Sequence, residues 1–310
     1  MCSTPVLSGV SYRHGQWRDL VDLTERGLAA PGDIATLSQG GLTRYSVLDG
    51  HVRDHFAACA AETLESAGIE PSTVDAVLFF SSTFSSYDDH DDLVGLCRAL
   101  DMRKALPVGV FQAQCSNFSY ALMIATSLIR GQGMNTVLLL GADALDESRA
   151  GRLLPAAASV FSDTVLSCVV STEGNDGYAV EYVGHVVEPD LAVLDPVKQT
   201  LRFMDLFAAR LERLCTDTYA STGLRPESID HLVLANLGKP VLRNYAAVAG
   251  VPFTRVPTGN IARFGHCFAY DQLITLATLA ESGEITTGQL ALVLGVGANH
   301  LFSSTVLRRL

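Results

Sequence analysis

One cysteine in this chain stands where a nucleophile would be expected. Cys115 lies in the segment Phe111-Gln-Ala-Gln-Cys-Ser-Asn-Phe-Ser-Tyr120, at the junction between an expected strand and the helical pattern 118–130. Unpaired backbone N–H groups and the positive end of the helix dipole favour the thiolate there, which is the nucleophilic form of the side chain. The alternative is a buried structural thiol, because a free cysteine is most often a small core residue.

A histidine occupies a similar junction near the C-terminus. His266, in the segment 265–268, precedes another helical pattern. Its imidazole is able to act as a general base towards a thiol or an acceptor hydroxyl. Asp271 follows five positions later, about one turn into the helix, where its carboxylate is able to hold the second ring nitrogen as the third member of a triad does. A lone histidine is more often structural or exposed, so the assignment depends on a link to Cys115.

An internal repeat supplies that link. The segment 71–80 parallels 226–235, and Cys115-Ser-Asn-Phe-Ser-Tyr-Ala-Leu parallels Cys267-Phe-Ala-Tyr-Asp-Gln-Leu-Ile. The distance from the proline that starts each first segment to the cysteine is 44 residues in one half and 41 in the other. Similar segments in the same order and at nearly the same spacing indicate a duplication. The alternative is that all strand–helix units look alike.

The duplication predicts two halves with one shared site. Residues 1–175 form a half that carries the nucleophilic cysteine, and residues 176–310 form a half that carries the catalytic histidine. A pseudo-twofold axis between them places Cys115 and the His266–Cys267 pair at equivalent helix N-termini. This geometry favours a single catalytic site that contains both side chains.

Short apolar runs alternate with longer helical patterns, which is typical of an α/β fold. The runs predict buried strands and the patterns predict helices that position the two junctions. The expected strands cover 76–81, 136–141, 164–171, 178–187, 231–237 and 290–295, and the expected helices cover 118–130, 196–221, 240–250 and 268–283.

The composition excludes several classes of protein. Among 310 residues, 22 are Lys or Arg and 33 are Asp or Glu, so the formal charge is −11, while 48% are hydrophobic and 18% charged. A disordered chain has lower hydrophobicity, and a nucleic-acid binder or a protein that adsorbs to anionic membranes has a basic face. No apolar run is long enough to span a bilayer, and residues 1–5 show no signal peptide.

The seven cysteines are an odd count with no C-x-x-C pair, which favours reduced thiols in the cytoplasm and argues against a zinc knuckle. The acidic run 88–92 lacks the spaced ligands of a calcium loop, so no metal is expected. The segment 295–300 lacks the last glycine of a dinucleotide-binding motif, and no P-loop or G-x-S-x-G elbow occurs. We therefore expect no cofactor.

Three segments together resemble the β-ketoacyl-ACP synthase III family of the thiolase superfamily. The octapeptide from Cys115 resembles the nucleophile motif C-A-G-F-x-Y-A-L, the segment 160–164 resembles the F-G-D-G-A turn, and the segment 288–299 resembles the terminal strand and glycine loop. The resemblance implies a five-layer αβαβα fold with two similar halves, a homodimer, and an acyl group carried as a thioester on Cys115. It also implies an oxyanion hole from the backbone N–H groups of Cys115 and Ala298.

The departures from the family are informative. Its ordinary members pair the cysteine with a His and an Asn, which stabilise the enolate formed when malonyl-ACP decarboxylates. Here Ala235 falls where that His belongs, Gly238 falls where the H-Q-A-N motif ends, and His266 falls on the Asn. Cys115, His266 and Asp271 thus resemble the Cys-His-Asp site of the family's acyltransferase-like branch.

Three functions follow as hypotheses. In the first, Cys115 takes an acyl group from acyl-CoA or from the phosphopantetheine of an acyl carrier protein and passes it to a hydroxyl or amine of a small molecule, in polyketide-type or antibiotic biosynthesis. In the second, the enzyme is a decarboxylative condensing or starter-priming synthase that uses His266 alone. In the third, the chain is a non-catalytic partner subunit of a synthase. The acyl chain, the acceptor and the donor carrier are left open.

Overall fold

The computed structural model of the chain describes residues 4–83, 89–147, 151–174, 176–196 and 198–310. Residue 175, at the predicted boundary between the halves, lies outside the described residues, as do Asp88 and the side chains of the rest of the acidic run 88–92. Within the described ranges, no helix is both long and apolar enough to cross a membrane.

Nine strands of the described chain form one large sheet with a mirrored order. From one edge to the other the order is β5-β4-β6-β7-β1-β8-β11-β10-β9. Counted outward from the centre, the N-terminal half runs β1, β7, β6, β4 and the C-terminal half runs β8, β11, β10, β9. In each half the first strand is therefore followed by the last, the penultimate and the second, and the N-terminal half adds β5 at its edge. The strands are β1 (Val6–His14), β4 (Ala76–Phe80), β5 (Leu106–Val110), β6 (Thr136–Asp143), β7 (Thr164–Ser171), β8 (Tyr178–Val187), β9 (His231–Val233), β10 (Leu290–Gly297) and β11 (Leu301–Arg309).

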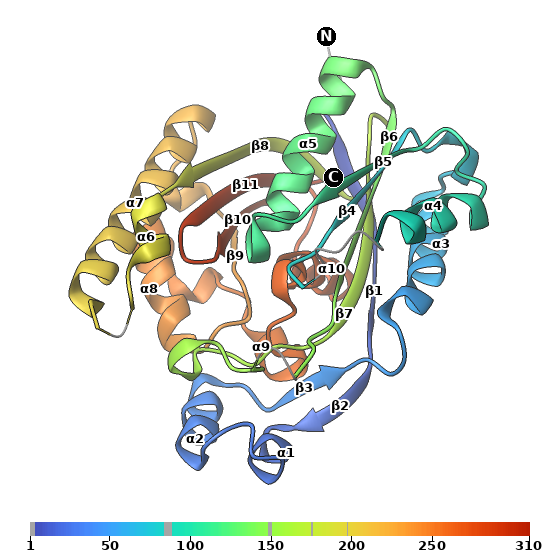
Figure 1. Cartoon of the computed structure of the whole chain (residues 1–310). Helices are drawn as coiled ribbons and strands as arrows, with labels where there is room; N and C mark the ends of the chain where they lie inside the picture. The colour runs from blue at the N-terminus through green and yellow to red at the C-terminus, as the bar shows by residue number, and fades with distance from the viewer. Residues whose placement is uncertain (1–3, 84–88, 148–150, 175, 197) are drawn as a thin grey trace.

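Helices cover this sheet in three layers, as Figure 1 shows. Helices α5 (Asn117–Gln132) and α10 (Asp271–Glu281) lie in the middle, between the two halves of the sheet. On the outer faces, α3 (Phe56–Ala67) and α4 (Asp89–Ala99) cover the N-terminal half, while α7 (Thr200–Thr222) and α8 (Lys239–Ala249) cover the C-terminal half. The predicted five-layer αβαβα fold is confirmed.

The apolar alternation along the strands explains the layers. In β4, Leu78 and Phe80 enter the central core while Val77 and Phe79 pack against the outer helices. In β10, Val293 faces the central core. Both faces of these strands are buried, which is why they read as nearly continuous apolar runs.

Smaller elements complete the fold outside the large sheet. The excursion between β1 and α3 forms a two-stranded sheet with two helices, visible at the lower edge of Figure 1. These elements are β2 (Gln16–Asp19), β3 (Arg44–Val47), α1 (Leu20–Glu25) and α2 (Pro31–Gly40), and α6 (Pro189–Val193) and α9 (Gly259–Phe264) follow later in the chain.

Candidate active site

The nucleophile turn lies between β5 and α5. Cys115 is half-buried and sits in a single 3-10 turn, Gln114–Ser116, directly before α5. Asn117, which is fully buried, fixes this turn from its first helical position: its Oδ1 accepts the N–H of Ala113 at 3.0 Å and its Nδ2 donates to the carbonyl of Ser81 at 2.7 Å. The junction therefore presents the thiol at a helix N-terminus, as the sequence predicts.

The base turn lies between α9 and α10 and is clamped by a neighbouring loop. His266 donates its backbone N–H to the carbonyl of Val160 at 2.8 Å and accepts the N–H of Ser162 at 2.9 Å. Its ring lies against Phe161, with 5.2 Å between ring centroids. Gly265 has φ +62, and a Cβ there would lie 3.0 Å from the Val160 carbonyl oxygen, so this position requires glycine. The imidazole is consequently held in one orientation.

The three predicted catalytic side chains lie together. His266 Nε2 is 3.4 Å from Cys115 Sγ, and His266 Nδ1 is 2.5 Å from Asp271 Oδ2. Asp271 is fully buried and His266 is only 2% exposed. The carboxylate fixes the proton on Nδ1, so Nε2 is left to exchange a proton with the thiol. The site can therefore generate a thiolate and later accept a proton from an attacking group.

The surroundings of His266 favour its charged form. Burial by itself lowers the pKa of the imidazole, but the negative charges of Asp271 and Cys115 and the hydrogen bonds to both raise it, with a net rise from 6.5 to about 10. An imidazolium between a thiolate and a carboxylate is the arrangement that activates a cysteine at neutral pH.

This raised pKa makes the stability of the fold depend on pH. The folded state keeps the His266 proton that the unfolded chain releases above pH 6.5, so the contribution is complete below pH 6.5 and lost as the pH rises towards 10. The difference in free energy of unfolding between the wild type and His266→Gln should fall with pH over this window, by up to about 1.4 kcal/mol per pH unit. Urea denaturation from pH 6 to 10 measures it, and a difference that is flat with pH contradicts the prediction.

The β10–β11 turn packs against the nucleophile turn. Gly297, the last residue of β10, lies so close to the nucleophile turn that a Cβ would be 1.9 Å from the carbonyl oxygen of Ala113. Ala298 follows with φ +49. Among the described residues, no acceptor takes the N–H of Cys115 or of Ala298. Both N–H groups are thus without a protein acceptor among the described residues, and their use as the oxyanion hole stays a prediction.

The two helix starts carry the same cap. Asp271 Oδ1 accepts the N–H of Cys267 at 2.8 Å, four residues earlier, as Asn117 Oδ1 accepts that of Ala113. Both cap residues are fully buried and open a central helix. This shared cap makes Asn117 and Asp271 structural counterparts.

The cap corrects one detail of the predicted repeat. Gln114 and Phe268 have matching left-handed φ values of +45 and +52. The counterpart of Cys115 is therefore Ala269, so the expectation that Cys115 and the His266–Cys267 pair occupy equivalent positions was wrong by two residues. The sequence comparison matched the two cysteines, whereas the structure matches the starts of the helices.

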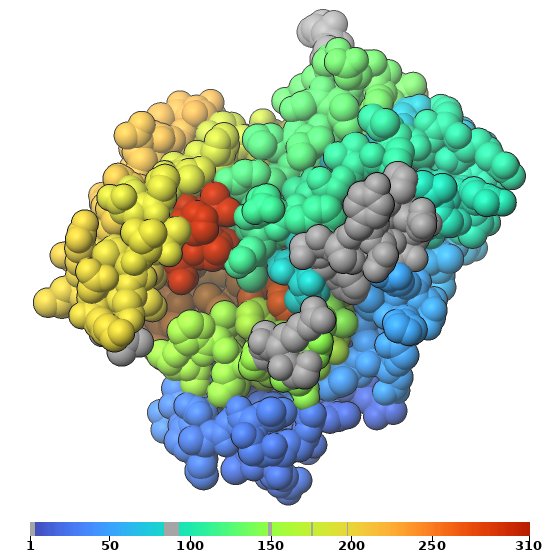
Figure 2. Space-filling model, in the orientation of Figure 1, coloured from blue at the N-terminus to red at the C-terminus, as the bar shows by residue number. Residues whose placement is uncertain are grey.

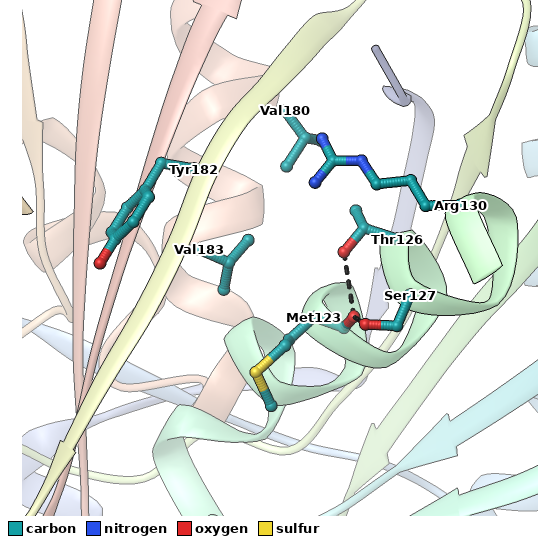
Figure 3. A pocket seen from close by; sticks show the side chains of 7 residues that line it. All are labelled: Met123, Thr126, Ser127, Arg130, Val180, Tyr182 and Val183. Carbon is teal, nitrogen blue, oxygen red and sulfur yellow. Dashed lines mark hydrogen bonds between the residues drawn. The ribbon is translucent and has the colours of Figure 1, made fainter. Parts of the chain in front are cut away.

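One cavity lies away from the thiol. It measures about 190 Å³ and opens between α5 and β8, as Figure 3 shows. Its lining contains none of the three predicted catalytic side chains and consists of Met123, Thr126, Ser127, Arg130, Val180, Tyr182 and Val183. The hydroxyls of Thr126 and Ser127 both donate to the carbonyl of Met123. Figure 2 shows a hollow in the molecular surface. It lies between the yellow α6–α7 segment and the yellow-green segment 151–161, with the red β10–β11 segment at its wall.

Known proteins are similar to this chain in sequence. Residues 219–309 match the family described as 3-oxoacyl-acyl-carrier-protein (ACP) synthase III C terminal. The β-ketoacyl-acyl-carrier-protein synthase III of Prochlorococcus marinus is 26% identical over 278 residues, which cover 80% of this chain and 79% of the relative. The β-ketoacyl-acyl-carrier-protein synthase III 4 of Streptomyces coelicolor is 24% identical over 323 residues, covering 97% and 92%.

Solved structures share the fold. The acyltransferase ChlB3 superposes with a TM-score of 0.86 at 18% identity, covering 99% of this chain and 98% of its own. The 3-oxoacyl-acyl-carrier-protein synthase III of Aquifex aeolicus superposes with a TM-score of 0.80 at 18% identity, covering 98% and 99%. Both similarities extend over at least 98% of this chain.

Proposed function

Because this chain is a β-ketoacyl-ACP synthase III-like protein of the thiolase superfamily, an acyl-transferring or condensing enzyme, we propose that it is a ping-pong acyltransferase. The acyl group passes from a CoA or acyl-carrier-protein thioester to Cys115, and from there to a hydroxyl or amine of a small-molecule acceptor. The observation that supports this most is the single chain of contacts from Cys115 through His266 to the buried Asp271.

The first half-reaction forms the acyl-enzyme. The Cys115 thiolate attacks the carbonyl carbon of the donor thioester, and the N–H groups of Cys115 and Ala298 bind the oxyanion of the tetrahedral intermediate. The intermediate collapses by breaking the bond to the donor sulfur, which takes the proton from His266 Nε2. The products are S-acyl-Cys115, a neutral imidazole and the free pantetheine thiol.

The second half-reaction uses the neutral imidazole as a base. Acylation removes the thiolate charge that had raised the pKa of His266, so Nε2 becomes free to accept a proton. As the acceptor oxygen or nitrogen attacks the thioester, its proton passes to Nε2, and the tetrahedral intermediate expels the Cys115 thiolate. Asp271 stabilises the imidazolium that results, and the resting state is restored.

Intact-mass spectrometry tests the proposal. The protein is incubated with a panel of acyl-CoA donors and with acyl carrier protein loaded with the same groups, and the mass of one acyl group is sought on the chain. We expect an adduct with at least one donor, which decays when the correct acceptor is added. Absence of a Cys115-dependent adduct with every donor of both kinds rejects the proposal.

A decarboxylative condensation is the second candidate, because the curated relatives are β-ketoacyl-ACP synthases. The polar groups near position 235, where the family has its His, argue against condensation. Residue 235 offers only a methyl group, and the amide of Asn236 donates to Asp271 and Gly265 instead of the thiol. Release of carbon dioxide from a malonyl thioester that requires His266 would favour condensation over acyl transfer to oxygen or nitrogen.

The metabolic role, the location and the oligomeric state of the enzyme belong to the same proposal. We place the enzyme in specialised, polyketide-type metabolism in the cytoplasm, as a homodimer with no cofactor. Turnover by the isolated protein would exclude the third hypothesis, a non-catalytic partner subunit, which Ala235 motivated and which the intact triad opposes.

A further inference from the structure

The carboxylate of Asp271 is held by a residue outside the predicted triad, at the second position of the segment 235–238 that aligns with the H-Q-A-N motif. Asn236 follows β9 in the loop that leads to α8, and it is 3% exposed. Its backbone N–H donates to Asp271 Oδ2 at 2.7 Å, and its side-chain Nδ2 donates to Asp271 Oδ1 at 3.0 Å. One residue thus contacts both oxygens of the carboxylate.

These bonds complete the hydrogen bonding of a fully buried anion. Oδ2 also contacts His266 Nδ1, and Oδ1 also accepts the N–H of Cys267. A carboxylate has about four lone-pair positions, and four donors occupy them here. Two of the four come from Asn236, so this residue supplies half of the donors that hold the Asp271 carboxylate in place.

Asn236 also holds the backbone beside the imidazole. Its Nδ2 donates a second hydrogen bond, at 2.8 Å, to the carbonyl of Gly265, the residue before His266. The amide therefore bridges the carboxylate that contacts the ring and the chain that carries the ring. A shift of Asn236 would move both supports of His266 at once.

We propose that Asn236 is a positioning residue, which acts on the thiol through Asp271 and His266 without touching substrate. The inference rests on the proposed use of the triad and adds a fourth residue to it. A role in folding alone would place Asn236 in the same loop, but it would leave the proton on His266 Nδ1 and the reactivity of Cys115 unchanged when the side chain is altered.

Two readouts on Asn236→Ala separate these roles. The first is the downfield proton resonance expected for the N–H between His266 Nδ1 and Asp271, recorded by NMR. The second is the pH profile of Cys115 alkylation by iodoacetamide, followed on the Cys115 peptide by mass spectrometry. We expect the resonance to vanish or move upfield and alkylation at neutral pH to slow about tenfold, because the imidazolium no longer lies firmly against the thiolate.

Ser159→Ala is the matched control. Ser159 Oγ donates to the carbonyl of Asn236 at 2.6 Å, so the variant removes a buried hydrogen bond from the same residue but neither of its two donors to Asp271. It should keep the resonance and the alkylation profile of the wild type. If Ser159→Ala and Asn236→Ala change both readouts equally, Asn236 is structural and the proposal is wrong.

Asn236→Asp covers the case in which the alanine variant does not fold. It keeps the size and the backbone donor but places a second carboxyl oxygen about 3.0 Å from Asp271 Oδ1, where two carboxylates share a proton. An additional ionisation should appear in the alkylation profile, and a wild-type profile overturns the proposal. Neither readout needs an acyl donor, so a protein that never forms an acyl adduct defeats the proposed function alone.

Discussion

Replacing Cys115 with alanine should abolish the acyl adduct with every donor and lower turnover by about four orders of magnitude or more. The thiol is the group that forms the covalent bond, and the structure places it at the start of α5 with His266 Nε2 at 3.4 Å. Without Sγ the imidazole and the two backbone N–H groups have no nucleophile to assist. Intact-mass spectrometry of the variant with the donor panel measures the result.

Cys97→Ala is the control for this variant. Cys97 is also partly exposed, but burial raises the pKa of its thiol, and no imidazole is recorded beside it in the described part of the chain. The adduct should persist in Cys97→Ala. An adduct that survives Cys115→Ala and disappears with another cysteine would mean that the nucleophile is misassigned.

Asp271→Asn should separate the two half-reactions. The nucleophile and the imidazole beside it are both still present in the first half-reaction, so acylation should slow without stopping. Transfer to the acceptor should fall by about 10³- to 10⁴-fold, because the amide no longer stabilises the imidazolium or fixes the tautomer. His266→Ala should likewise spare or slow acylation and stop transfer, and rapid-quench measurement of each step gives the ratio.

Asp230→Asn is the matched control for the carboxylate. Asp230 Oδ2 accepts the N–H of Leu290 at 2.8 Å, at the beginning of β10, so it is another backbone-capping aspartate of the same half. Acylation and transfer should both continue in this variant. If Asp271→Asn slows both half-reactions equally, Asp271 supports the nucleophile alone, and the base function of His266 would be rejected.

The sequence predicts the layers and the triad because both depend on local patterns. Apolar runs that are buried on both faces, such as 136–141, are unmistakable strands, and a cysteine or histidine before a helix is visible in the chain. Strands β1, β5 and β11 were not among the predicted strands, and β11 carries three consecutive buried hydroxyl residues, Ser303, Ser304 and Thr305. The hydroxyl of Ser304 forms a buried hydrogen bond with that of Thr218, with 2.6 Å between Ser304 Oγ and Thr218 Oγ1.

The contacts that hold Asp271 and His266 in place could not be predicted from the sequence, for a different reason. The predicted strand 231–237 ends at Val233, and the residues after it turn so that Asn236 reaches Asp271. The segment 235–238 aligns with the H-Q-A-N motif, but the local pattern does not connect Asn236 with Asp271, because the partners of its amide are 29 and 35 positions away. The clamp of residues 160–162 on His266 is equally non-local, and only the family resemblance drew attention to that segment.

The shared cap of Asn117 and Asp271 bears on how such a site can arise. Each half of the duplicated fold already provides a place for an acceptor oxygen at the start of its central helix. The codons for asparagine and aspartate differ by one nucleotide, so a gene copy can acquire the anion there while the backbone of the junction stays as it is. The negative charge that supports a catalytic histidine then appears at a cap position that the fold already had. The same Asn-to-Asp substitution can be tested in a relative that lacks the aspartate.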